Sequence, residues 1–328
     1  MHSLIKRFKR SSEAYLIAVI LLFVVILSFA TPDFLTLNNW VDLIESYSVT
    51  AILAIGLFVV LVTGGIDISF AATASVAQYV AAYAAVRLNL PPAVVLVVGL
   101  TVGTLLGFFN AILIDRLRAT AIIITISSMS VYFALLMYFT GGKSIYGLPG
   151  WWSDSMVLFE VATGPDQSAR FTLPILVMLI VAVFTAFIMN RTSLGRQLYA
   201  MGGNPEAARR VGVSLSTMQW FAYGYLGLLA GVAGLLQAHR VGESVPNAMI
   251  GTELNVVAAA VLGGASLLGG IGSVSGVVLG IFLLAILRNG LNLLGVSPYF
   301  FQIVIGLILL ASTGITGLSL RRRRVAEA

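Results

Sequence analysis

Residues 199–216 read YAMGGNPEAARRVGVSLS and form a polar segment between two long apolar blocks of the sequence. This segment predicts a short helix. Asn204 suits the N-cap, because its side chain can accept a hydrogen bond from a free backbone N–H, and Pro205 suits the first helical position. Glu206 lies where the helix dipole favours an anion, and Gly212 can end the helix in a left-handed conformation. Since about two turns of helix are unstable alone in water, we expect this helix to pack against another surface.

The rest of the chain is strongly apolar. Of its 328 residues, 59% are hydrophobic and 10% are charged, and the mean hydropathy is +1.00. A soluble domain does not need so many apolar residues, so this composition predicts a protein that crosses the membrane several times. The net charge of +6 does not indicate nucleic-acid binding, because the basic residues flank apolar spans. The chain has no cysteine, which excludes disulfides and thiolate metal sites.

Ten apolar stretches predict an all-α fold with about ten transmembrane helices. The first, residues 15–30, follows a basic N-terminus; a cleavable signal peptide is the alternative, but the length favours a retained span. We expect the other spans near residues 48–63, 67–86, 92–114, 120–140, 172–189, 218–240, 253–268, 272–290 and 299–318. External loops are expected at residues 31–47 and 141–170, the second with Trp151 and Trp152 as interfacial anchors.

The basic residues orient these spans. With both termini in the cytoplasm, the inner segments hold 14 of the 19 basic residues, as the positive-inside rule requires. These are Lys6, Arg7, Lys9, Arg10, Arg116, Arg118, Arg191, Arg196, Arg209, Arg210 and Arg321 to Arg324. The outer segments hold Arg87, Lys143, Arg170, Arg240 and Arg288. This orientation places residues 190–217, with the predicted short helix, in a cytoplasmic loop.

Two glycine-rich sequences indicate an internal repeat. Residues 99–109, GLTVGTLLGFF, match residues 272–282, GSVSGVVLGIF, in the spacing of three glycines and a phenylalanine. Glycines four residues apart line one helix face and let a neighbouring backbone approach closely. We expect this packing role for Gly99, Gly103, Gly107, Gly272, Gly276 and Gly280. A duplication would divide the single membrane domain, residues 1–328, into halves 1–145 and 172–320 of inverted topology; the alternative is that such small-residue runs are simply common in membrane helices.

Glycines also interrupt one apolar segment in each half, at residues 63–69 (TGGIDIS) and 262–270. Broken helices in both halves are typical of a substrate pathway, because non-helical backbone at membrane depth must be buried in protein or face water. Asp67 is the only carboxylate flanked closely on both sides by apolar sequence. It can contact substrate or act as the N-cap of a helix that begins at Ile68. We expect the pathway to be lined by Asp67, Ser69, Asn110, Asn255 and Ser266.

No catalytic or metal-binding motif is present in the sequence. It contains no HExxH or GxSxG motif and no cluster with metal-ligand spacing. The nearest match to a phosphate-binding loop, at residues 142–144, has Met137 where the loop requires its first glycine. The sequence therefore predicts no catalytic residues and no metal site, and any ATP-driven activity would require another chain.

The helix at residues 204–212 resembles the coupling segment of ABC importer permeases, in which Glu-Ala-Ala is followed by a glycine. Here these residues are Glu206, Ala207, Ala208 and Gly212. Together with TGGIDIS at residues 63–69 and VLGGAS at residues 261–266, they resemble the ribose/xylose/arabinose-type sugar permease family over nearly the whole chain. Phe70 and Ala71 depart from the pattern of many members, and the sequence Ile68-Ser69-Phe70 is closer to that of permeases for the autoinducer-2 signal.

This resemblance implies the permease subunit of a binding-protein-dependent importer of a monosaccharide or sugar-like molecule in the bacterial inner membrane. It implies three partners: an ABC ATPase subunit, a periplasmic or extracellular sugar-binding protein, and a second permease copy or paralogue. The ATPase would use ATP and Mg and bind Asn204, Pro205, Glu206, Ala207, Ala208 and Gly212, while this chain would bind no cofactor and would not be an enzyme. The alternatives are a branched-chain amino-acid-type ABC permease and an ion-coupled secondary transporter, which would need a buried ionisable relay.

Overall fold

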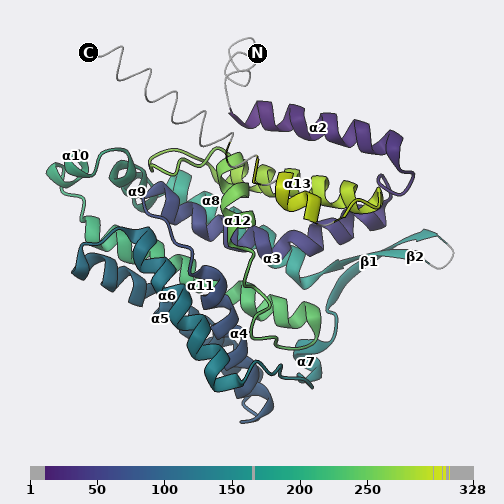
Figure 1. Ribbon diagram of the computed structural model, residues 1–328, viewed down its shortest axis with the longest axis horizontal. Helices are drawn as coiled ribbons and strands as arrows, with labels where there is room; N and C mark the ends of the chain where they lie inside the picture. The colour runs from purple at the N-terminus through teal and green to yellow at the C-terminus, as the bar shows by residue number, and fades with distance from the viewer. Residues whose placement is uncertain (1–11, 165–166, 298, 305, 308–309, 311–328) are drawn as a thin grey trace.

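The computed structural model describes residues 12–164, 167–297, 299–304, 306–307 and 310, and it is built almost entirely of helices (Figure 1). Seven of the described helices are long and apolar enough to cross a membrane. They are α2 (Ser12–Ala30), α3 (Leu37–Val62), α5 (Pro92–Leu117), α6 (Ala121–Thr140), α8 (Leu173–Arg191), α11 (Leu215–Val241) and α13 (Val274–Leu293). Two shorter apolar helices are α4 (Phe70–Val86) and α12 (Glu253–Leu262). The fold is that of a polytopic helical membrane protein, as the composition predicted.

Some of the predicted features lie outside the described residues. They are the terminal basic residues Lys6, Arg7, Lys9, Arg10 and Arg321 to Arg324, and most of the predicted span at residues 299–318. The division into inverted halves also stays a prediction.

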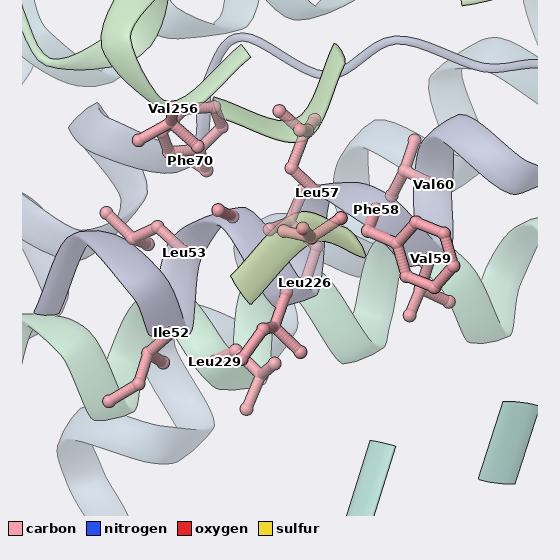
Figure 2. Packing of buried hydrophobic residues seen from close by; sticks show 14 of the residues in the cluster. Ile52, Leu53, Leu57, Phe58, Val59, Val60, Phe70, Leu226, Leu229 and Val256 are labelled. Atoms are coloured by element: carbon pink, nitrogen blue, oxygen red, sulfur yellow. The ribbon is translucent and has the colours of Figure 1, made fainter. Parts of the chain in front are cut away.

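Helices α3 and α11 form the centre of the molecule. Every residue of α3 from 51 to 62 is buried, which explains why this stretch of sequence is apolar without a break. Figure 2 shows how Ile52, Leu53 and Leu57 of α3 pack beside Leu226 and Leu229 of α11. Helices α4 and α5 pack on α11, while α12 and α13 pack on α3.

The glycines of α5 lie against α11. A Cβ atom at Gly103 would come within 3.0 Å of backbone atoms of Gly227, and one at Gly107 would come equally close to the carbonyl oxygen of Tyr223. Gly99 faces the side chain of Leu235. The backbones of α5 and α11 are therefore in direct contact, because neither helix carries side chains between them.

The second glycine series packs differently from the first. Gly276 and Gly280 of α13 meet backbone atoms of Gly263 and Ala259, at the end of α12. Gly272 is not on the helix face that the sequence predicted, because α13 begins only at Val274, after the N-cap Ser273. The two series therefore differ, because all three glycines of the first series lie within α5, whereas Gly272 precedes α13.

The predicted external loop at residues 31–47 is wrong beyond Thr36. Helix α3 begins at Leu37, and the Thr36 side chain caps it by accepting a hydrogen bond from the backbone N–H of Asn39 at 3.3 Å. Asp42, one of the polar residues that led to the loop prediction, instead lies on the side of the helix that faces a cavity, as does Ser46. An amphipathic helix end looks like a loop when only its polarity is considered.

The region of the predicted loop at residues 141–170 contains three elements that the sequence did not reveal, two strands and a short helix. Strands β1 (Val157–Gly164) and β2 (Gln167–Thr172) form an antiparallel hairpin that projects from the helices (Figure 1). Phe159 stacks on Phe171 at 4.3 Å between ring centroids. Hydrogen bonds from Ser168 and Arg170 lower the pKa of the Glu160 carboxyl, in line with cross-strand pairing.

The short helix α7 (Gly150–Ser153) also lies in this region and corrects the prediction for Trp152. This side chain is buried, and its indole N–H donates to the Leu235 carbonyl of α11 at 3.0 Å. Trp152 therefore holds α7 against the helices, whereas the neighbouring Trp151 remains partly exposed.

Candidate functional site

The polar segment at residues 199–216 covers the end of α9 (Ser193–Gly203), all of α10 (Pro205–Arg210) and the first residues of α11. The predicted start of α10 is confirmed: the Asn204 side chain accepts a hydrogen bond from the backbone N–H of Ala207 at 3.0 Å, and Pro205 is the first helical residue. Residues 199–203 belong to α9, which the sequence analysis did not separate from the polar segment.

The predicted end of α10 is confirmed as well. Gly212 has φ +89°, the left-handed conformation that a β-branched residue would adopt only with strain. The backbone N–H of Val213 donates to the Ala208 carbonyl at 3.0 Å, and that of Gly212 donates to the Arg209 carbonyl at 3.0 Å. These two bonds form a Schellman motif, so α10 is capped at both ends by its own residues.

Helix α10 presents most of its surface to the outside. Within it only Ala208 is buried, where the helix meets α9 and α11. Glu206 pairs with Arg210 at 2.5 Å, although both side chains are about three-quarters exposed and the pair adds little stability. A shallow hollow of about 390 Å³ lies beside the helix, and it is lined by Pro205, Glu206, Arg209, Arg210 and Leu215. The exposed face is therefore a polar surface that no described residue covers.

Both glycine breaks meet α9 directly. The backbone N–H of Gly270 donates to the Val62 carbonyl at 2.9 Å, and a Cβ atom at Gly269 would lie 2.8 Å from the Cα of Gly64. Gly202 of α9 contacts the same backbone segments, and the Tyr199 hydroxyl donates to the Gly272 carbonyl at 2.8 Å. The backbone of α9, the helix before α10, is thus in direct contact with the C-terminal end of α3 and with the loop after α12.

Sequence reasoning missed the role of Gly202 in this junction. The available signal was the Gly202-Gly203 pair at the edge of the polar segment, which resembles the glycine pairs of the two breaks. A third glycine pair between long helices would have indicated a third close backbone approach.

Asp67 is the centre of a buried hydrogen-bond network. Its Oδ1 accepts hydrogen bonds from the backbone N–H and the hydroxyl of Ser69, both at 2.7 Å. The Asn110 amide donates to the Ser69 hydroxyl at 2.7 Å, and the Tyr132 hydroxyl donates to Asn110 Oδ1 at 3.1 Å. In the described chain no basic side chain pairs with Asp67. These bonds connect the first break to α5 and α6.

The predicted N-cap role of Asp67 is wrong in position. Helix α4 begins at Phe70, two residues later than expected, and its N-cap is Ser69. Asp67 instead bonds to the backbone two residues ahead, in an Asx turn that shapes the break before the helix.

The five predicted pathway residues lie in three separate places. Asp67, Ser69 and Asn110 are together in the network and are at most 2% exposed, so they are closed off from solvent. Ser266 lies in the loop after α12, where its hydroxyl accepts from the backbone N–H of Leu268 at 3.1 Å. Asn255, in α12, lines a cavity.

This cavity has a volume of about 450 Å³ and lies among α3, α11, α12 and α13. Arg240 of α11 lines it and donates to the Ser46 carbonyl at 2.8 Å. Arg288 of α13 lies over the ring of Phe301, 5.4 Å from its centroid. Polar side chains make up much of the lining, so the cavity can accept a small polar molecule.

A bundle of long apolar helices with two glycine breaks that meet at one junction, an exposed capped helix and a polar cavity is the arrangement of a membrane transport protein. Residues 39–313 match the family described as branched-chain amino acid transport system / permease component, and the chain belongs to this family. It is a transport subunit and not an enzyme.

Curated relatives cover nearly the whole chain. The ribose import permease protein of Haemophilus influenzae is 32% identical over 308 residues, which are 94% of this chain and 93% of the relative. The galactose/methyl galactoside import permease protein of Escherichia coli strain K12 is 31% identical over 95% of this chain and 96% of its own length. The autoinducer 2 import system permease protein of Yersinia pestis is 32% identical over 94% of this chain and 85% of its own length. No solved structure matches the chain.

Proposed function

We propose that this chain is the membrane-spanning subunit of an ATP-driven, binding-protein-dependent importer that carries a monosaccharide or sugar-like molecule across the bacterial inner membrane. The observation that carries this proposal is the similarity, over more than nine-tenths of the chain, to permeases whose names specify the import of ribose and galactose. The similarity to an autoinducer 2 permease keeps other small sugar-like molecules within the proposal.

Helix α10 is the proposed contact with the ATPase subunit, which would supply the ATP and Mg chemistry while this chain binds no cofactor. Support comes from its exposed face and from the two caps that define its ends. A displacement of α10 would reach α9 first. Since Gly202 of α9 contacts the backbone of both glycine breaks, the same displacement would move the segments that surround the transport route.

The proposed orientation puts α10 and both termini in the cytoplasm. It is supported by basic residues that lie near α10. Arg116 and Arg118 are at the C-terminal end of α5. This end lies beside the start of α11, because the Ser216 hydroxyl donates a hydrogen bond to Asp115 at 2.8 Å. Arg191 and Arg196 lie at the junction of α8 and α9. A periplasmic or extracellular binding protein would then dock on the opposite face, and a second copy or a paralogue would complete the transport path.

Branched-chain amino acids are the second candidate substrate, because the description of the family names them. Such a substrate carries an ammonium and a carboxylate group, each of which needs a charged or strongly polar partner. Uptake of labelled D-ribose, D-galactose and L-leucine by cells that express the complete system would separate the two candidates.

The coupling role of α10 is tested by Gly212→Val and Glu206→Lys. Valine at φ +89° introduces backbone strain of roughly 1–3 kcal/mol at the helix end. Lysine at position 206 breaks the pair with Arg210 and places a cation at the helix N-terminus. We expect both variants to insert normally and to lose ATPase co-purification, stimulated ATP hydrolysis and uptake together.

Matched controls for these variants lie in the loop after α6 and in the hairpin. Gly147→Val also places valine at a positive φ, +71°, and Glu160→Lys also breaks an exposed ion pair. Both controls should keep ATPase co-purification at the level of the unsubstituted chain. If Gly212→Val and Glu206→Lys do the same, α10 is only a connector and the proposed importer loses its coupling site.

A further inference from the structure

The cavity among α3, α11, α12 and α13 is separate from both α10 and the Asp67 network. Its volume of about 450 Å³ is in the range of small-molecule sites, roughly 300–1,000 Å³. We infer that this cavity is the site where the permease itself contacts its substrate, and that the substrate is an uncharged polyhydroxylated molecule of monosaccharide size. The inference rests on the proposed import function and adds the place and the chemistry of the contact.

The position of the cavity fits a site of entry. Arg240, near the C-terminal end of α11, lines the cavity, whereas Leu215, the first residue of α11, lines the hollow beside α10. A helix of 27 residues is about 40 Å long, which exceeds the roughly 30 Å hydrocarbon core of a membrane. The cavity therefore lies at the membrane face opposite α10, the face at which a binding protein would release substrate.

Several polar groups in the cavity have no partner within the described chain. The Tyr47 hydroxyl is buried in the cavity and lies close to the Arg288 guanidinium. The side chains of Asn255, Asn292 and Thr50 also line the cavity without a side-chain hydrogen bond among the described residues. Amide and hydroxyl groups both donate and accept, as the hydroxyls of a sugar do. A sugar would complete the bonds that the described residues leave open.

The two basic groups of the cavity already contact other residues of the described chain. Its charged lining residues are two arginines and one aspartate, Asp42. Both arginines already have partners, because Arg240 donates to the Ser46 carbonyl and Arg288 lies over the ring of Phe301. Their remaining N–H groups can donate to hydroxyl oxygens. The rings of Tyr47 and Phe301 offer apolar surfaces that suit the C–H faces of a sugar ring.

Protection from thiol labelling tests this site. Because the chain has no cysteine, Asn255→Cys and Asn292→Cys each introduce the only thiol. Ala162→Cys, on the exposed face of β1, is the matched control outside the cavity. Each variant, assembled with its ATPase in lipid nanodiscs, would react with a maleimide in the presence of excess D-ribose, D-galactose, L-leucine or inorganic phosphate. We expect one or both sugars to slow labelling at positions 255 and 292 several-fold and to leave position 162 unchanged.

Other outcomes overturn the inference. If neither sugar slows labelling while ATPase co-purification and sugar uptake persist, the site is wrong and the proposed function stands. Slowing by leucine or phosphate alone would refute an uncharged ligand.

As a second measurement, Asn255→Ala should raise the KM for uptake several-fold without changing ATPase association, and Asn255→Ser should restore part of the loss. A KM equal to that of the unsubstituted chain would also overturn the site, whereas a failure of the unsubstituted chain to bind any ATPase would contradict the proposed function instead.

Discussion

Burial of the Asp67 side chain costs free energy, and nearby hydrogen bonds offset part of this cost. A carboxylate in an apolar region loses its hydration, and in the described chain no cation compensates it. Two hydrogen bonds from Ser69 and the further link to Asn110 offset part of this cost. The network therefore stabilises the non-helical backbone between α3 and α4, and its members are coupled to one another.

Asp67→Asn should be tolerated far better than Asp67→Leu. Asparagine keeps an oxygen at the position of Oδ1, whereas leucine leaves the Ser69 N–H and hydroxyl without an acceptor, at about 1–3 kcal/mol for each buried group. We expect the asparagine variant to retain ATP-driven uptake and the leucine variant to lose thermal stability in detergent. Equal loss of uptake in two folded variants, together with uptake driven by a proton gradient without ATP, would favour an ion-coupled secondary transporter.

At the scale of elements, the contact between α5 and α11 depends on small residues on both helices. Gly103 and Gly107 face Gly227 and the backbone of Tyr223, so the two helices touch without intervening side chains. Association of helices in lipid relies on such close packing, because lipid tails compete equally well for apolar side chains. This contact anchors α5 to the central helix that joins the α10 end of the molecule to the cavity.

Gly103→Leu should separate these helices. The new side chain would overlap the backbone of Gly227 and Gly231, and overpacking of this kind costs at least about 1–3 kcal/mol. We expect lower thermal stability and a lower yield of monodisperse protein by size-exclusion chromatography, and the same for Gly276→Leu against Gly263. Thr101→Leu, on the exposed side of α5, is the control and should behave like the unsubstituted chain. Normal stability of both glycine variants would show that these faces do not pack.

At the scale of the whole molecule, the exposed helix α10 and the polar cavity lie apart, and the packed helices connect them. The exposed helix α10 lies at one end of α11 and the polar cavity at the other. Between them, the two glycine breaks and α9 share one junction of backbone contacts at Gly64, Gly202 and Gly269. A movement that begins at α10 would therefore pass through this junction before it reaches the cavity.

The proposed orientation of the molecule predicts which positions are reachable from each side. In the cysteine-free chain, single cysteines at Arg116 and Arg321 should be protected from an impermeant maleimide on intact cells, and those at Lys143 and Trp151 should be labelled. Arg321 lies outside the described residues, so its labelling also tests the predicted cytoplasmic C-terminus. Labelling of position 321 from outside would refute an even number of spans with both termini inside.

Features that depend on neighbouring residues were predictable from the sequence alone. Asn204, Pro205 and Gly212 define both ends of α10, because capping bonds connect residues only a few positions apart. Seven of the ten expected spans were predictable for a similar reason, since crossing a membrane requires a continuous run of suitable length. The expected spans at residues 67–86 and 253–268 instead form the shorter helices α4 and α12. Residues 37–47 were a further exception: their polarity indicated a loop, while the cavity they face allows a polar helix.

The tertiary structure alone decided which distant residues meet. Gly202 could be placed beside Gly64 and Gly270 only once α3, α9 and the loop after α12 were packed together. The same holds for the cavity, in which Tyr47 and Asn255 are brought together by α3 and α12. Helix capping and membrane-spanning hydropathy depend on residues that are close together in the sequence, so a local pattern predicts them. Contacts between helices depend on shape and close packing across the whole molecule, which no local pattern specifies.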